Sequence, residues 1–246
     1  MTADIRPIFV VGSPRSGTTL MRSILDAHPS IVCPPWETGI FVALADLIER
    51  YERTQAKHHF LEDEGSIWQW TRQVVDDLMA RVTGSFGKPR WAEKTPAHVL
   101  HIELIHRVYP QAQFVHIIRN GYEVVRSLQN MTWAPHYVRG NASTWVNYVR
   151  AGRQAARALP AGLYHELRYD ELVAKPEGLL RQLCDFLGEP FEPQMLAFDQ
   201  PQNNTFGATR EPIMAEVKRD YRELTRLQRW MFNSVAGSLM RELGYR

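Results

Sequence analysis

The sequence predicts an α/β fold in which helices flank both faces of a central parallel sheet. Short apolar runs rich in β-branched residues alternate along the chain with longer segments of helical periodicity. This alternation is typical of parallel strands joined by helical crossovers. The 246 residues contain no repeat, low-complexity tract or linker that would divide them. We therefore expect one domain spanning residues 1–246.

Three apolar runs are predicted to be strands, and they cover residues 7–12, 113–118 and 163–167. Helical spacing of apolar residues predicts helices over residues 17–27, 36–51, 67–82, 122–130, 143–159, 176–187 and 223–243. A further helix is expected to begin at Thr95 and Pro96, a capping residue followed by proline at the first helical position. The proline-rich stretch 189–213 is predicted to be a long irregular loop.

Composition and charge exclude several classes of protein. The 29 Lys and Arg residues are nearly balanced by 27 Asp and Glu, which leaves no overall positive field for nucleic acid. No apolar run approaches the ~18 residues that a membrane span needs, and the first residues lack the plan of a signal peptide. Two cysteines, Cys33 and Cys184, are too few for a disulfide scaffold. We expect reduced thiols in a cytoplasmic protein, and the oligomeric state stays open.

Residues 12–19, directly after the first predicted strand, are predicted to hold a phosphate group. Their sequence, Gly-Ser-Pro-Arg-Ser-Gly-Thr-Thr, fits the Walker pattern except at Thr18, where that pattern has lysine. Backbone N–H groups of such a loop converge on an anion at a helix N-terminus. The lysine that reaches the β- and γ-phosphates in nucleotidases is missing, whereas Arg15 offers a planar set of donors. The alternative is a plain turn capped by Thr18.

A second anion site is predicted where the strand 113–118 ends. Arg119 follows this strand directly, at the edge where open α/β sheets bind ligands. Nucleotidases commonly use an aspartate in a comparable setting to hold Mg²⁺, so a cation here favours a second anionic group. Ser127 lies about two helical turns further on and could join Arg119 around one phosphate. Alternatively, Arg119 pairs with Glu123 or caps the turn.

In order and spacing, these two motifs resemble those of sulfotransferases that use 3′-phosphoadenosine-5′-phosphosulfate (PAPS), most closely the bacterial and tyrosylprotein-type branch. The resemblance implies a P-loop-like fold. It implies that Arg119 and Ser127 hold the 3′-phosphate of the donor. Residues 167–172 resemble the family segment whose tyrosine lies at the nucleotide, which implies a donor contact for Tyr169. The residues that the resemblance assigns to the 5′-phosphosulfate are those of the loop: Arg15, Ser16, Gly17, Thr18, Thr19 and Leu20.

The same resemblance implies catalytic roles for two residues outside these motifs. In the tyrosylprotein-type enzymes a glutamate in a Glu-Thr setting is proposed as the general base, and Glu37 matches it. A lysine before a similar helix acts on the leaving group, and Lys94 matches that, with Arg15 assisting. The residues alone leave other roles open, because Glu37 could cap a helix and Lys94 could pair with Glu93. Shielding of Glu37 from water by Trp36 would suit a base that works near neutral pH.

The segment 202–210 corresponds in sequence position to a loop that closes over the nucleotide in family members. The resemblance therefore implies a donor contact for Arg210, with Lys218 as an alternative. Four histidines, His98, His101, His106 and His116, are predicted to be structural. His101 and His106 share a helical turn without carboxylate partners at metal-ligand spacing, so no metal site is expected, and His116 alternates within a strand as a packed core residue would. Five aromatic side chains could line an acceptor pocket, but helical spacing favours the core for most of them: Trp36, Phe41, Trp68, Trp70 and Trp133.

The sequence therefore predicts a metal-independent O-sulfotransferase that uses PAPS and releases 3′,5′-adenosine bisphosphate. Its expected partner is a hydroxyl-bearing acceptor, whether peptide tyrosine, sugar, lipid or small metabolite. Two alternatives stay open. One is a P-loop kinase with a degenerate lysine, which requires a strand-end aspartate for Mg²⁺ that the sequence does not offer. The other is a protein that binds adenosine bisphosphate without catalysing transfer.

Overall fold

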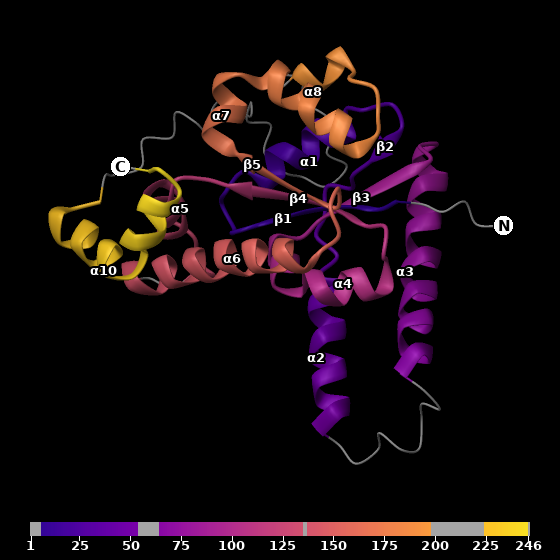
Figure 1. Ribbon diagram of the computed structural model, residues 1–246, viewed down its shortest axis with the longest axis horizontal. Helices are drawn as coiled ribbons and strands as arrows, with labels where there is room; N and C mark the ends of the chain where they lie inside the picture. Colours follow the sequence, from indigo (N-terminus) through magenta and orange to yellow (C-terminus); the bar gives the residue numbers. More distant parts are fainter. Residues whose placement is uncertain (1–5, 54–63, 135–136, 198–223, 246) are drawn as a thin grey trace.

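The computed structural model describes residues 6–53, 64–134, 137–197 and 224–245 (Figure 1). Its centre is a sheet of five parallel strands in the order β2-β3-β1-β4-β5. Strands β1 (Ile8–Gly12), β4 (Gln113–Ile118) and β5 (Tyr164–Arg168) confirm the three predicted strands. The sequence pattern misses β2 (Ile31–Val32) and β3 (Arg90–Lys94). The charged residues of β3 break the apolar pattern that identifies a strand in the sequence. The segment is extended because it pairs with β1.

The helices follow the predicted order with small shifts at their ends. They are α1 (Thr18–Asp26), α2 (Ile40–Arg53), α3 (Glu64–Phe86), α4 (Ile102–Val108), α5 (Gly121–Leu128), α6 (Val138–Ala158), α7 (Tyr169–Ala174), α8 (Pro176–Leu187) and α10 (Arg226–Glu242), with 3₁₀ helices η2 (Pro96–His101) and η3 (Pro193–Leu196). The short helix α7 is not predicted by the sequence. The helix expected at Thr95 begins as η2, and the Thr95 side chain does not cap it, because its hydroxyl donates to Glu93 instead.

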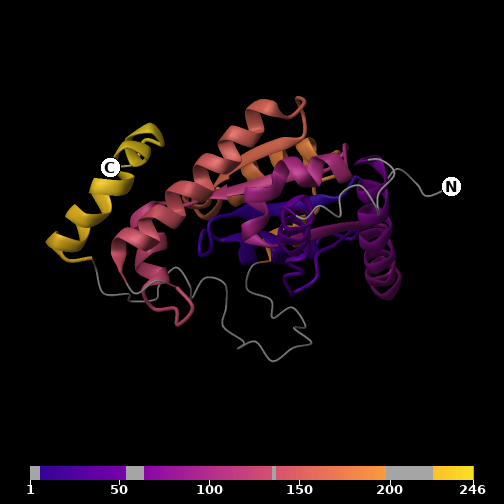
Figure 2. The same ribbon diagram turned by 90° about the horizontal axis from the view of Figure 1, so that it is seen from below.

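Helices cover both faces of the sheet, as predicted. In Figure 1, α1, α7 and α8 lie on one face, and α6, α4 and α2 lie on the other. Helix α10 packs against α5 and α6 and, in the view of Figure 2, stands at the end of the molecule opposite α3. The two central strands β1 and β4 are buried along their whole length and are mostly apolar, which is the pattern expected for a parallel sheet.

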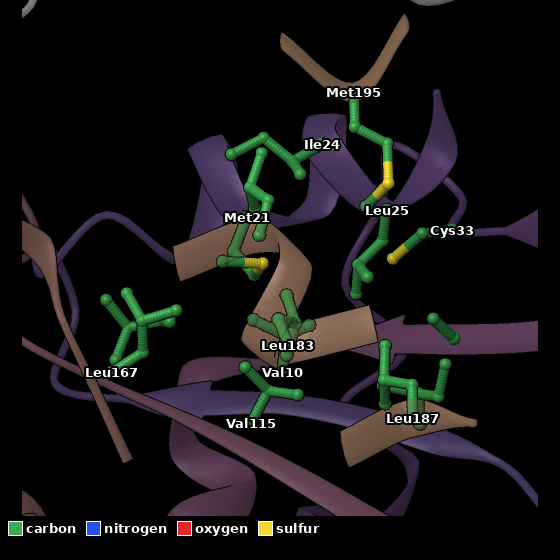
Figure 3. Packing of buried hydrophobic residues seen from close by; sticks show 14 of the residues in the cluster. Val10, Met21, Ile24, Leu25, Cys33, Val115, Leu167, Leu183, Leu187 and Met195 are labelled. Carbon is green, nitrogen blue, oxygen red and sulfur yellow. The ribbon is translucent and has the colours of Figure 1, made fainter. Parts of the chain in front are cut away.

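Successive residues of β1 enter different cores because strand side chains alternate between faces. Val10 packs with Met21, Leu25 and Leu183 on the α1 and α8 side, as Figure 3 shows. Phe9 points to the other face, where its cluster includes residues of α3 and α4. The two cores fix β1 from both sides, and with it the start of the loop that follows Gly12.

Helix α3 has apolar side chains on more than one face, and only one of these faces is buried. Trp70, Val74 and Leu78 are exposed, and Val75 faces the core in their place. Apolar residues occur around much of this helix, so periodicity supports two neighbouring faces about equally. Packing against α4, β3 and β2 selects the buried one.

Both cysteines are unpaired and buried, which fits the expectation of reduced thiols. Burial raises the pKa of the Cys33 thiol well above its usual range and that of Cys184 to about 11, so neither is a reactive thiolate at neutral pH. Within the described ranges, none of the helices combines the length and apolar character needed to cross a membrane.

Candidate functional site

The predicted site residues come from the carboxyl ends of the five strands of the sheet. Since the strands are parallel, these ends meet at one edge, where the sheet order reverses around β1. The edge points toward α5 in Figure 1. The contributions are the loop after β1, Glu37 after β2, Lys94 at the end of β3, Arg119 after β4 and Tyr169 after β5.

Two glycines shape the loop between β1 and α1. Gly12 has φ +151°, and a Cβ there would lie 2.5 Å from the carbonyl oxygen of Ile117. Gly17 has φ +104°, and a Cβ there would lie 2.3 Å from Cδ2 of Tyr169. Both positions therefore require glycine, and the ring of Tyr169 packs directly on the loop. This contact supports the expectation that Tyr169 lies at the anion site.

The N-terminus of α1 carries no side-chain cap. Its N-cap is Gly17, so the alternative of a turn capped by Thr18 is wrong. The first N–H groups of a helix lack intrahelical acceptors and can bind an anion. Among the loop side chains, Thr19 is exposed, whereas Leu20 lies in the core and can contribute only backbone atoms.

Two further loop residues indicate a ligand. Arg15 has φ +70°, a left-handed conformation that costs a non-glycine residue on the order of 1 kcal/mol. Ser16 is fully buried, and its Oγ has no hydrogen-bond partner among the described residues. A buried hydroxyl without a partner is costly, and a bound anion at this loop would provide an acceptor.

The two predicted anion sites form one hydrogen-bonded unit. Arg15 donates from Nε to Oγ of Ser127 at 2.9 Å, across 112 positions of sequence. Nη1 of Arg119 lies 3.5 Å from the carbonyl oxygen of Arg15, and its guanidinium stacks 4.3 Å from the ring centroid of Tyr169. These contacts unite the β1 loop, the β4 end and the β5 end. The loop, Arg119 and Ser127 therefore lie together at this edge of the sheet.

Arg119 also pairs with Glu123, as the alternative interpretation of the sequence proposed. Oε2 of Glu123 lies 2.8 Å from Nε and 2.6 Å from Nη2 of Arg119. Glu123 thus holds one edge of the Arg119 guanidinium, and the Tyr169 ring covers one of its faces. The pairing does not exclude a phosphate contact, because an arginine side chain has a second pair of N–H groups at its other edge.

Lys94 and Glu37 form an ion pair at the carboxyl edge of the sheet. The Lys94 side chain is only 6% exposed, whereas that of Glu37 is 50% exposed. The alternative pairing of Lys94 with Glu93 is therefore wrong. Shielding of Glu37 from water by Trp36 is wrong as well, since half of the Glu37 side chain is exposed and the tryptophan is itself 40% exposed. The arrangement puts a solvent-accessible carboxylate against a buried ammonium.

A buried network beside this pair was missed by the sequence reasoning. Oε1 of Glu93 accepts from the backbone N–H of Thr38 at 3.1 Å, from its hydroxyl at 2.9 Å, and from the Thr95 hydroxyl at 2.5 Å. Oε2 lies 2.8 Å from Nδ1 of His98, close enough for an ion pair but outside hydrogen-bond angles. The sequence signal for this network is the acidic residue within Trp91-Ala-Glu-Lys. That the residue is buried becomes apparent only when this segment is assigned to a strand.

His116 is a packed core residue, as predicted. It is fully buried, and its Nδ1 contacts the hydroxyl of Tyr164. Burial lowers the pKa of His116 to about 4, with opposing influences from Glu166 and Arg153. The other histidines in the described ranges form no group of three or more metal-ligating side chains there.

The remaining candidates give a mixed result. Arg210 and Lys218 lie outside the described residues. Phe41 is buried in the core, as expected, and Trp68 is partly buried against it. Trp133 is 63% exposed, so the expectation that most of the five aromatic side chains lie in the core is wrong for it as well as for Trp36 and Trp70.

Sequence comparisons identify the family to which the chain is similar. The model of the sulfotransferase family matches residues 7–193. An uncharacterized protein of Aquifex aeolicus is 31% identical over 206 residues, covering 78% of this chain and 27% of that protein. Protein-tyrosine sulfotransferase A of Caenorhabditis elegans is 24% identical over 200 residues, covering 78% of this chain and 52% of the relative. The chain thus spans about half or less of the length of these relatives.

Solved structures share the fold. The sulfotransferase domain from the curacin biosynthetic pathway superposes with a TM-score of 0.62 at 21% identity, covering 98% of both chains. A mouse sulfotransferase in complex with PAP gives a TM-score of 0.55 at 14% identity, covering 97% of this chain and 84% of the other. The fold is therefore the P-loop-like fold of these enzymes, and the match of the family model over most of the chain shows that the protein belongs to the sulfotransferase family.

Proposed function

We propose that this protein transfers a sulfuryl group from PAPS to a hydroxyl-bearing acceptor. The observation that carries the proposal is the contact between Lys94 and Glu37 at the same sheet edge as the anion loop. Sulfuryl transfer needs a base for the acceptor hydroxyl and a cation for the oxygen of the leaving phosphate. The pair offers one group of each kind, and the exposure of Glu37 leaves it accessible to an acceptor.

The side chains at this edge supply the hydroxyl and cationic groups that the proposed donor would need. We propose that the amides at the start of α1, with Ser16, Thr18 and Thr19, hold the 5′-phosphosulfate. Arg119 and Ser127 hold the 3′-phosphate, and Tyr169 packs beside them. The buried hydroxyl of Ser16, which has no partner among the described residues, supports this assignment. The mouse neighbour, whose fold is similar, is a complex with PAP.

In the proposed reaction the donor supplies the sulfuryl group as a substrate. Glu37 accepts the proton of the acceptor hydroxyl, whose oxygen forms a new bond to sulfur as the bond from sulfur to the 5′-phosphate oxygen breaks. Lys94 donates a hydrogen bond to the departing oxygen, and Arg15 and the loop amides add positive potential there. Fixed donors of this kind can stabilise the developing charge without a metal ion.

The acceptor is proposed only as a class. The Caenorhabditis elegans relative is named for protein tyrosine, and that likeness supports a hydroxyl acceptor without selecting phenol over alcohol. A cytoplasmic location remains a prediction from the sequence. The kinase alternative lacks support in the described part of the chain, because the residues directly after the five strands are Ser13, Cys33, Thr95, Arg119 and Tyr169, none of them an acid.

Thermal unfolding in the presence of nucleotides tests the proposal. A ligand that binds only the native state raises Tm by mass action. At a ligand concentration of a hundred times Kd, the free energy of unfolding increases by about 2.7 kcal/mol. We expect a large shift with 3′,5′-adenosine bisphosphate, a smaller one with AMP and the smallest with Mg²⁺-ATP. Release of the bisphosphate from PAPS is then measured with a tyrosyl peptide, a phenol, a sugar and an alcohol. A shift with Mg²⁺-ATP alone would overturn the proposal, and binding without transfer would favour the non-catalytic alternative.

A further inference from the structure

Glu93 has none of the roles assigned above, although it directly precedes Lys94 on β3 and contacts Thr38, the neighbour of Glu37. It is 2% exposed, in the middle of a core. Burial by itself raises the pKa of Glu93, but the contact with His98 and the hydrogen bonds from Thr95 and Thr38 lower it by more, so the carboxyl group stays ionised. A buried carboxylate that accepts hydrogen bonds from several donors is held rigidly in place.

The contacts of Glu93 tie two separate segments together. Thr38, the neighbour of Glu37, donates to Oε1 twice, through its backbone N–H and its hydroxyl. Thr95, the neighbour of Lys94, donates to the same oxygen at 2.5 Å and accepts from the backbone N–H of Gly39 at 3.2 Å. The residues that follow Glu37 are therefore bonded to the two residues that flank Lys94, Glu93 and Thr95.

The direction of the strand explains why Glu93 acts through its neighbours. Adjacent side chains of a strand point to opposite faces. Glu93 is in register with Phe9 of one core, and Lys94 is in register with Val10 of the other. Glu93 therefore faces away from Lys94 and influences the pair through the backbone and through Thr38.

We propose that Glu93 is a positioning residue that, through Thr38 and Thr95, sets the distance between the Glu37 carboxylate and the Lys94 ammonium. This inference rests on the proposed function. Glu37 is half exposed and sits on a connecting segment, so it needs such an anchor to be held in place. A displacement of about 1 Å in a catalytic group can cost on the order of 10²-fold in rate.

The chain offers closely matched variants for the test. Thr38→Val removes one hydroxyl and keeps shape, and Thr38→Ser restores the hydroxyl. Glu93→Gln keeps one acceptor oxygen, which cannot serve both the threonines and His98. Thr71→Val is the control, because it makes the same change on α3, at a threonine that is buried more deeply than Thr38 and whose hydroxyl has no partner among the described residues.

We expect Thr38→Val and Glu93→Gln to lower kcat by tenfold or more, with KM for PAPS and the affinity for 3′,5′-adenosine bisphosphate unchanged. Thr38→Ser should recover most of the rate, and Thr71→Val should match wild type. Amide hydrogen exchange of residues 37–39 should speed up in Thr38→Val, while exchange in α8 should stay the same. This second measurement judges the anchor without reference to activity.

The outcomes separate the two proposals. If wild type releases no bisphosphate from PAPS with any of the four acceptors, the proposed function fails, and with it the catalytic meaning of the anchor. If wild type is active and Thr38→Val is as fast as Thr71→Val, only the positioning role of Glu93 fails. Equal loss of nucleotide affinity and kcat would also overturn it, because the network would then serve general structure.

Discussion

Arg15 and Ser127 are joined by a hydrogen bond of 2.9 Å from Nε to Oγ, which connects the loop after β1 to the second turn of α5. The bond joins the two motifs that the sequence predicts to bind anions. It also orients the guanidinium of a residue whose backbone is left-handed. The site is thus partly organised before a ligand arrives, which reduces the ordering cost of binding.

Ser127→Ala should weaken binding of 3′,5′-adenosine bisphosphate by about ten- to a hundredfold. It removes a buried hydroxyl proposed to contact the 3′-phosphate, and a hydrogen bond to a charged group contributes about 1.5–3 kcal/mol. Affinity for AMP, which has no 3′-phosphate, should change little. Isothermal titration calorimetry with both nucleotides checks this. Equal losses for the two ligands would remove Ser127 from the 3′-phosphate site.

Glu37→Gln should lower the rate of sulfuryl transfer by about 10²- to 10⁴-fold, the range that a general base contributes. Affinity for 3′,5′-adenosine bisphosphate should persist, because the side chain is assigned to the acceptor and not to the donor. The matched control is Glu177→Gln, an exposed glutamate paired with Arg181 on α8. Transfer and nucleotide binding are measured on the same preparation. Full activity in Glu37→Gln would exclude this residue as the base.

Gly17→Ala should destabilise the protein by about 1–3 kcal/mol and weaken nucleotide binding. The added Cβ would lie 2.3 Å from Tyr169, at φ +104°, where an alanine is strained. Gly84→Ala is the control, because nothing lies within 4 Å of its Cβ and it lies in the last turn of α3, with helical backbone. That change should stabilise by about 0.5–1 kcal/mol. Urea unfolding measures both, and equal stability of the two variants would contradict the assigned loop geometry.

His116→Gln should reduce the loss of stability between pH 7 and pH 5 by about 2 kcal/mol. The pKa of His116 falls from 6.5 to about 4 on folding, chiefly through burial. The unfolded chain therefore binds more protons than the native state in this window. Stability contributed by the neutral imidazole is present above pH 6.5 and is lost as the pH falls toward 4. Urea unfolding at the two pH values checks the slope, and an unchanged slope would mean that His116 titrates normally.

Several features could be predicted from the sequence because their causes are local. Two glycines, with a strand before them and a helix after them, predict an anion-binding loop over residues 12–19. In the structure both glycines have positive φ. His116 was correctly assigned to the core, and β1, β4 and β5 follow from continuous apolar runs. In each of these cases the residue or its immediate neighbours carry the physical requirement.

The tertiary structure decided what depends on distant partners. Strand β3 forms although it is charged, because β1 pairs with it, and that pairing puts Lys94 at the sheet edge. The Glu37 contact of Lys94 spans 57 positions, and Arg15 reaches Ser127 across 112. No periodicity encodes such pairs, and α3 shows how packing chooses between two apolar faces. The sequence by itself determined the order of elements and the loop chemistry, whereas the parallel sheet, by gathering its strand ends at one edge, decided which charged side chains meet.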